Sequence, residues 1–279
     1  MLSYRHAFHA GNHADVFKHL ILVQLARYLG QKEKPFWYID THAGAGAYAL
    51  NEGYATKLAE YREGIGRLWE RDDLPPLVAD YVSLVRQLNG DGQLRVYPGS
   101  PWLARQTLRQ QDRLRLFELH SSDSKLLNEN FADLREQAQV VAGDGFKGLK
   151  ALLPPPPRRA LVLIDPSYET ANDYSGVIAA LEEALRRFPT GCYALWYPQL
   201  ARLESRQLPD KLKRLPAAKW LHTTLSLRPT AGPGMHGSGM FLINPPWTLE
   251  TDLRATLPWL ANTLTQDEPA RFVLEAQEN

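Results

Sequence analysis

Short apolar runs that end in an acidic residue recur along this chain, and they constrain its fold more than any other feature. Four strand-like runs are followed by a carboxylate, and in chain order these acids are Asp40, Glu118, Asp144 and Asp165. Stretches with helical spacing separate the later runs, and strands that alternate with helices indicate a parallel sheet covered on both faces. Because the carboxyl ends of parallel strands meet at one edge of a sheet, the four acids are expected to face one crevice. The sequence therefore predicts an α/β fold with a ligand site at that edge.

The positions of the other elements follow from periodicity and turn residues. Strands are expected at 35–40, 114–119, 139–142, 160–164, 192–197, 223–227 and 240–243, and helices at 13–29, 122–135, 174–188 and 250–264. The first helix has Asn12 as its N-cap and Gly30 as its stop, and its polar face carries Asp15, Lys18 and His19.

One stretch departs from the alternation of strands and helices. Residues 52–90 show only helical spacing, and the loop at 89–92 closes them. We therefore expect a main domain made of 1–50 and 93–279, with 51–92 as an inserted helical subdomain. Trp247 and Trp259 lie in apolar surroundings and are expected in the core, and the polar tail after Gln266 is expected to be dispensable.

Composition sets limits on the class of protein. A chain of 279 residues with a net charge of +1 can bury a large core, and any nucleic-acid contact must come from clustered Lys and Arg. The single cysteine, Cys192, builds neither a disulfide framework nor a thiolate zinc site. No signal peptide and no stretch of membrane-spanning length is present, so a cytoplasmic location is expected.

The acid after the run at 160–164 is the first residue of the motif Asp165-Pro166-Ser167-Tyr168. Such a stretch suits methyl transfer to an exocyclic amine of a base, because the carboxylate and the Pro166 carbonyl accept hydrogen bonds from the amine. The ring of Tyr168 offers a stacking face. Taken alone, a strand that ends in a proline turn explains these residues equally well.

The other three strand ends suggest contacts to a cofactor. The turn at 41–47 follows Asp40 and contains Gly44, which lets a ligand approach the backbone, but a third glycine needed for a dinucleotide fingerprint is missing. A carboxylate there repels a pyrophosphate and attracts an amino group, as in S-adenosylmethionine. Glu118 can bind both hydroxyls of a ribose, and Asp144 beside Gly145 can accept the amino group of an adenine. Surface carboxylates and an ordinary Asp-Gly turn are the plainer explanations.

The N-terminal segment is rich in basic and aromatic residues. Tyr4 and Arg5 suit base stacking and phosphate contact, and a solvated basic arm is the simpler alternative. His9 and His13 are four residues apart, yet no Asp or Cys completes a familiar ligand pattern with them, so no metal is expected.

With these residues described, the chain resembles the RlmJ-type 23S ribosomal RNA adenine-N6 methyltransferases. The matching sequence motifs are LSYRH (2–6), FHAGNHAD (8–15), DTHAGAG (40–46), YPGSP (97–101), ALWYP (194–198) and INPPW (243–247). The resemblance runs in collinear order over nearly the whole chain. It implies a Rossmann-like class I methyltransferase fold with a small helical insertion after the first strand, and S-adenosylmethionine as the methyl donor.

Carried over by position, the resemblance also implies roles for single residues. The donor contacts would be His19, His42, Ser100, Glu118, Asp144, Gly145 and Asp165, to which we add Lys18, Asp40 and Gly44 from their places in the sequence. Asp165 would be the catalytic acceptor, with Pro166 and Tyr168 beside it, and Tyr4 would touch the RNA. Ser167 replaces the usual second proline, which loosens the turn, and slower chemistry is expected from it.

The expected reaction is a direct in-line displacement on the sulfonium methyl group, with the target adenine flipped into the pocket. Neither a metal nor a covalent enzyme intermediate is needed. The expected partner is 23S ribosomal RNA, with no membrane, and the chain is expected to act as a monomer. Three alternatives stay open: a DNA adenine-N6 methyltransferase, a nucleotide-dependent oxidoreductase, and a non-catalytic RNA-binding protein on the same scaffold.

Overall fold

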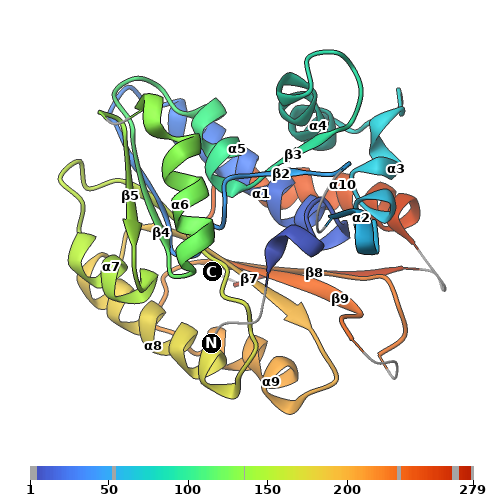
Figure 1. Cartoon of the computed structure of the whole chain (residues 1–279). Helices are drawn as coiled ribbons and strands as arrows, with labels where there is room; N and C mark the ends of the chain where they lie inside the picture. The colour runs from blue at the N-terminus through green and yellow to red at the C-terminus, as the bar shows by residue number, and fades with distance from the viewer. Residues whose placement is uncertain (1–4, 52–54, 135, 231–233, 266–269, 278–279) are drawn as a thin grey trace.

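A mixed β-sheet with helices on both faces forms the body of the molecule (Figure 1). The computed structural model describes residues 5–51, 55–134, 136–230, 234–265 and 270–277. The strands are β1 Trp37–Asp40, β2 Ala47–Ala49, β3 Val96–Pro98, β4 Arg113–Glu118, β5 Ala138–Ala142, β6 Ala160–Ile164, β7 Cys192–Gln199, β8 Trp220–Ser226, β9 Gly237–Ile243 and β10 Arg271–Ala276. The α-helices are α1 His13–Gly30, α2 Ala55–Leu58, α3 Gly66–Trp69, α4 Pro76–Leu88, α5 Ser100–Thr107, α6 Ser121–Asn130, α7 Gly145–Leu152, α8 Ala171–Arg187, α9 Leu203–Leu212 and α10 Leu249–Leu264. Short 3₁₀ turns lie at His6–Phe8, Glu60–Glu63 and Ala132–Leu134.

Strand direction divides the sheet into two halves. Within the described residues the strand order is β10-β8-β9-β7-β6-β1-β4-β5. The strands from β7 to β5 pair in parallel, whereas β9 is antiparallel to both β7 and β8, and β10 is antiparallel to β8. The expectation of a wholly parallel sheet was therefore wrong for β9 and β10. The tail after Gln266 contains residues 271–276, which form the edge strand β10, and its being dispensable stays a prediction.

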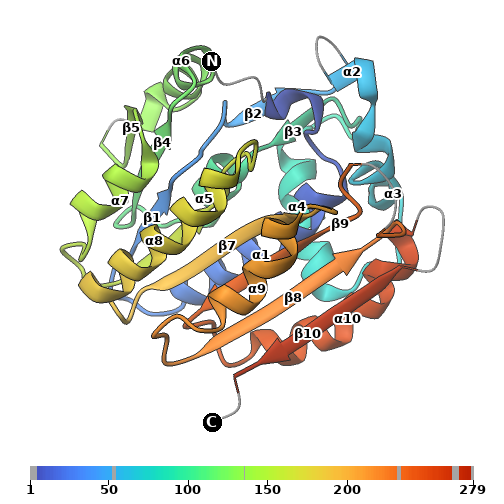
Figure 2. The ribbon, with the colours of Figure 1, turned by 90° about the horizontal axis from the view of Figure 1, so that it is seen from below.

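The sheet is the middle of three layers. Helices α1, α5 and α10 cover one face, and α7, α8 and α9 cover the other (Figures 1 and 2). In β6 successive side chains point to opposite faces, so Leu161 and Leu163 join the core under α1 while Val162 and Ile164 join the core under α8. Both faces of β6 are thus buried, which explains its unbroken apolar sequence.

Helix α1 begins and ends as its sequence predicts. The side chain of Asn12 accepts hydrogen bonds from the backbone N–H groups of Ala14 and Asp15, and Gly30 is the last helical residue. The polar face is not on the surface, however: Asp15, Lys18 and His19 are all buried. This helix therefore brings charged groups into the interior, which requires partners for them.

The stretch between β2 and β3 is helical, with α2, α3, α4 and a 3₁₀ turn. Strands β2 and β3 pair antiparallel at its base. Apolar residues of α3 and α4, among them Leu68, Tyr81 and Val85, belong to the same core as α1. The division into a main domain and an inserted subdomain stays a prediction.

Two tryptophans expected in the core differ in their surroundings. Trp259 is partly buried against the core, but Trp247 is 82% exposed, so its expected burial was wrong. Cys192 is buried, as expected of a small apolar residue. None of the helices formed by the described residues combines the length and the apolar character that crossing a bilayer demands.

Candidate active site

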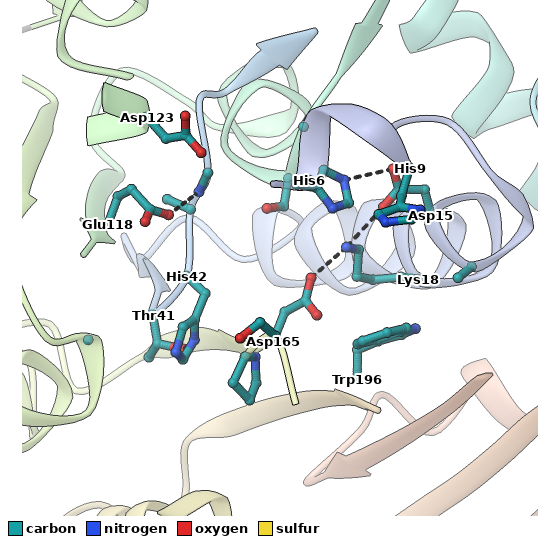
Figure 3. Close-up of a pocket in the computed structure, with 18 of the residues that line it drawn as sticks. His6, His9, Asp15, Lys18, Thr41, His42, Glu118, Asp123, Asp165 and Trp196 are labelled. Carbon is teal, nitrogen blue, oxygen red and sulfur yellow. Dashed lines mark hydrogen bonds and ion pairs between the residues drawn. The ribbon is translucent and has the colours of Figure 1, made fainter. Parts of the chain in front are cut away.

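A cavity of about 470 Å³ opens where the parallel strands β1, β4, β5 and β6 have their carboxyl ends. The 3₁₀ turn at His6–Phe8 and helix α1 border it on the other side (Figure 3). Of the residues selected from the sequence, it is lined by Lys18, His19, His42, Gly44, Ser100, Glu118, Asp144, Gly145, Asp165 and Pro166. Most of the residues selected from the sequence therefore lie on one continuous surface, although they come from segments far apart in the chain.

The turn after β1 is held by the acid at the end of β4. Glu118 accepts hydrogen bonds from the backbone N–H groups of Gly44 (2.8 Å) and His120 (2.7 Å). Burial raises the pKa of Glu118, and these two bonds oppose the rise. Gly44 has a φ of +61°, and a Cβ there would lie 2.2 Å from the hydroxyl of Tyr48, so glycine is required on both counts.

The turn after β5 approaches the β1 turn closely. Asp144 caps α7, because its Oδ1 accepts from the backbone N–H groups of Phe146 and Lys147. A Cβ on Gly145 would lie only 2.0 Å from the carbonyl oxygen of Thr41. The absence of a side chain at Gly145 is thus what lets the two turns border the same cavity.

Asp40 lies beneath the cavity and does not line it. Its carboxylate is fully buried and accepts hydrogen bonds from the hydroxyls of Tyr38 and Ser100, both at 2.7 Å. Burial raises the pKa of Asp40 to about 6, although these bonds and one from the backbone N–H of His42 oppose the rise. Direct contact with a ligand, which the sequence suggested for Asp40, was wrong for this structure; the residue supports Ser100 and His42 from below.

Two histidines line the cavity in neutral form. Burial lowers the pKa of His42 to about 4. Burial, aided by Lys18, holds the pKa of His19 well below its ordinary value, against the pull of Asp15. The Nδ1 of His19 is hydrogen-bonded to the hydroxyl of Tyr97 at 2.8 Å. Its Nε2 has no hydrogen-bond partner among the residues that the structure describes, so a buried polar atom borders the cavity unsatisfied.

Asp165, directly after β6, is paired with Lys18 of α1. Lys18 Nζ lies 2.5 Å from Asp165 Oδ2 and 3.0 Å from Asp15 Oδ1, so the ammonium bridges two carboxylates (Figure 3). The indole of Trp196, from β7, lies beside them, with its ring centroid 5.6 Å from Lys18 Nζ. Within the described part of the chain, the Asp165 carboxylate accepts its hydrogen bond from Lys18 through Oδ2.

Tyr168 does not reach the cavity. Its side chain is buried, its hydroxyl donates to the Trp196 carbonyl at 2.8 Å, and its ring packs against Tyr174 and Trp196. The expected stacking face was therefore wrong for Tyr168, and the aromatic side chain that lines the cavity is Trp196. The sequence missed Trp196 because its strand predicted only a buried run.

The N-terminal segment is described from Arg5 onward, so Tyr4 lies outside the described residues. Arg5 donates to the hydroxyl of Ser122 at 3.0 Å and lies 3.6 Å from Asp123. His6, for which no separate role was predicted, lines the cavity and lies 3.0 Å from Asp15. The ion pair of Asp15 and Lys18 was predictable, because side chains three residues apart on one helix lie on the same face.

The cavity has a strongly acidic lining. Among the described residues, its carboxylates are Asp15, Glu118, Asp123, Asp144, Asp165 and Asp173, and its one lysine is Lys18. Such a lining attracts a cationic ligand or an amine and repels phosphate. Within the described residues no group of three or more His, Cys, Asp or Glu is arranged to hold a metal ion.

Comparison with known proteins identifies the family. A family model described as "Ribosomal RNA large subunit methyltransferase D, RlmJ" matches residues 33–273. The chain belongs to the RlmJ family. Two proteins named "Ribosomal RNA large subunit methyltransferase J" are similar to it over most of both chains. The one from Haemophilus influenzae is 47% identical over 277 residues, covering 99% of this chain and 98% of that protein. The one from Escherichia coli is 49% identical over 265 residues, covering 95% and 94%.

A solved structure has a similar fold over nearly the whole chain. The crystal structure of a Legionella pneumophila protein has a TM-score of 0.88 and 37% identity, and it covers 96% of this chain and 98% of that one. Membership of the RlmJ family makes the chain a methyltransferase, as the sequence predicted. The predicted α/β class is confirmed by the largely parallel sheet with helices on both faces. The alternative of a nucleotide-dependent oxidoreductase is excluded by membership of the family.

Proposed function

We propose that this enzyme transfers a methyl group from S-adenosylmethionine to the N6 amine of an adenine in 23S ribosomal RNA. The names of the similar proteins support ribosomal RNA of the large subunit as the substrate class. The observation that carries the rest is the shared cavity of Asp165 and the glycine turn after β1. A carboxylate there can meet the amine of a base next to a cofactor site at the strand ends.

The residues of the cavity fit this donor. Its acidic lining suits a ligand with an amino group and a sulfonium, and Gly44 and Gly145 expose backbone at the turns. The unsatisfied Nε2 of His19 offers a polar contact. When bound, S-adenosylmethionine supplies an electrophilic methyl group.

We assign each donor contact to a part of the cavity. Glu118 would hold the ribose hydroxyls, and Asp144 with Gly145 would hold the adenine. The remaining contacts on the donor side would come from Lys18, His19, His42 and Ser100. Asp40 would act through Ser100 and His42, because both are within hydrogen-bond distance of its carboxylate.

Asp165 would receive the target amine. Lys18 already occupies Oδ2 of the Asp165 carboxylate, so Oδ1 is the oxygen left for the amine. With the Pro166 carbonyl as a second acceptor, the amine nitrogen would be fixed by two hydrogen bonds. Such alignment can lower the activation free energy by about 7 kcal/mol. Asp165 would take up the released proton directly or through water.

An aromatic wall would hold the flipped base. Trp196 lines the cavity beside Asp165, whereas Tyr168 supports it from behind through the Trp196 carbonyl. We therefore assign the stacking surface to Trp196 and a supporting role to Tyr168. Tyr4 and Arg5 are assigned to the RNA, and the enzyme is expected to act as a monomer.

The test is methyl incorporation with labelled S-adenosylmethionine into deproteinised large-subunit ribosomal RNA that lacks the modification. Duplex DNA rich in adenine serves as the comparison substrate. We expect label only in the RNA, and N6-methyladenosine as the labelled nucleoside after digestion. Label in DNA alone, or in a different nucleoside, would contradict the proposal.

A further inference from the structure

Asp15 is a buried carboxylate that connects three parts of the site. It is 1% exposed and lies in the first turn of α1. Its Oδ2 accepts from the backbone N–H of Gly11 at 2.9 Å and lies 3.0 Å from Nε2 of His6. Its Oδ1 lies 3.0 Å from Nζ of Lys18. The Asp15 side chain thus contacts the N-terminal segment, the start of α1 and the Lys18 ammonium, which in turn pairs with Asp165.

The charge of Lys18 depends on that arrangement. Its side chain is 5% exposed, and burial alone would lower its pKa. The carboxylates of Asp15 and Asp165 outweigh the burial and raise the pKa of Lys18 above its ordinary value, so the ammonium stays charged. Without Asp15, the ammonium would keep Asp165 as its one ionic partner among the described residues.

We propose that Asp15 is a positioning residue for methyl transfer. It holds the Lys18 ammonium between two carboxylates, and this keeps one oxygen of Asp165 occupied and the other turned toward the amine. It also holds His6 at the border of the cavity. This inference rests on the proposed function, because the orientation of Asp165 matters only if Asp165 receives the amine.

A second buried aspartate provides a matched comparison. Asp112 is fully buried, accepts from the backbone N–H of Phe36 at 2.9 Å and pairs with Arg109 at 2.9 Å. It lies just before β4, at the opposite end of that strand from Glu118, and does not line the cavity. The two residues share chemistry and burial, but Asp15 alone borders the site.

The experiment compares Asp15→Asn and Asp112→Asn with the unchanged enzyme. Single-turnover methyl transfer is measured with saturating S-adenosylmethionine and ribosomal RNA, and donor affinity is measured by calorimetry. We expect Asp15→Asn to slow transfer about 10- to 100-fold, since small misplacements of reacting groups cost that much. Its donor Kd is expected to stay within about threefold, and Asp112→Asn is expected to lower Tm while the folded enzyme keeps its rate.

A double variant tests the route of the effect. If Asp15 acts through Lys18, adding Asp15→Asn to Lys18→Met should slow transfer by less than about threefold, because interacting residues are not additive. The proposal would be overturned if Asp15→Asn slowed transfer in the Lys18→Met background as much as it does alone. It would also be overturned if the Asp15→Asn enzyme transferred methyl groups at the rate of the unchanged enzyme, or if its rate fell only as much as that of Asp112→Asn.

Two further measurements cover other outcomes. If Asp15→Asn does not fold, Asp15→Glu keeps the charge but moves it by one methylene. Its transfer should then be slower at unchanged donor Kd, and a rate within about twofold of the unchanged enzyme overturns the proposal. If the unchanged enzyme methylates no ribosomal RNA, the proposed function fails by itself. Acetylation of Lys18, mapped by mass spectrometry against exposed Lys147, then tests by itself whether Asp15 holds the Lys18 ammonium. Asp15→Glu should raise the reactivity of Lys18, and unchanged reactivity overturns that part of the inference.

Discussion

The two halves of the sheet each carry a group of charged and polar side chains, and the groups contain similar residue types. The cavity cluster consists of His6, Asp15, Lys18 and Asp165, and the edge cluster consists of Tyr197, Lys213, His222 and Glu275. In the edge cluster the hydroxyl of Tyr197 is 2.7 Å from Nε2 of His222, and Lys213 donates to Glu275 of β10. Burial lowers the pKa of His222, against the pull of Glu275.

What separates the clusters is their position relative to strand ends. The cavity cluster lies where parallel strands end and the chain turns away, which leaves room for a ligand. The edge cluster joins β7, β8 and β10 along their length, does not line the cavity, and ties the antiparallel edge strand to its neighbour. Residue type alone therefore does not identify a functional site; an acid and a lysine act on a ligand only where the fold leaves a cavity beside them.

The largest expected effect of a substitution is at Asp165. Asp165→Ala removes the oxygen assigned to the amine and also one partner of Lys18, so methyl transfer should fall by about 10²- to 10⁴-fold. The measurement is single-turnover transfer to ribosomal RNA, with donor affinity measured in parallel. Donor affinity is expected to fall less than the rate of transfer. Full activity of the Asp165→Ala enzyme would show that the cavity cluster takes no part in the reaction.

The acids at the strand ends were predictable because two simple patterns coincide there. Apolar runs buried on both faces mark strands such as β6, and parallel strands place their ends at one edge. Asp165 follows such a run, whereas Glu118 ends and Asp144 follows a strand that is only partly buried. The glycines beside them were predictable as sites of close backbone approach, and the structure gives the reason at Gly145.

Other features depend on contacts that no local pattern contains. The direction of β9 and the pairing of β10 come from tertiary packing, since short apolar strands read the same in either direction. Asp40 and Tyr38 share one face of β1, two residues apart, and Ser100 closes over them from α5, which hides the carboxylate. Tyr168 has a φ of +53°, and its ring packs behind Trp196.

A steric test of the cavity half uses the two glycines beside Asp144. Gly145→Ala would push a Cβ into the Thr41 carbonyl, so we expect a loss of about 1–3 kcal/mol in unfolding free energy together with weaker donor binding. In Gly143→Ala the new Cβ would meet its nearest neighbour at 3.9 Å, in ordinary contact. Chemical denaturation and calorimetry of both variants make the comparison, and equal tolerance of the two would contradict the close approach of the turns.

A pH measurement tests the buried acid under the cavity. Because the pKa of Asp40 rises to about 6, the folded protein binds a proton before the unfolded chain does as pH falls. The unchanged protein should therefore gain about 2 kcal/mol relative to Asp40→Asn between pH 8 and pH 4. The difference in unfolding free energy between the two proteins, measured across that range, checks this, and a difference independent of pH would contradict the burial of an ionisable Asp40.

The smallest expected effect lies in the edge cluster, and it sharpens the comparison most directly. Lys213 and Glu275 are partly exposed, so Glu275→Gln should lower the unfolding free energy by only about 0–1 kcal/mol. Amide hydrogen exchange should become faster in β10, because Glu275 ties this edge strand to Lys213, while methyl transfer stays unchanged. Slower transfer in a folded Glu275→Gln enzyme would mean that the edge cluster reaches the cavity through β7. The cavity cluster and the edge cluster would then belong to one coupled network that runs from β10 to Trp196.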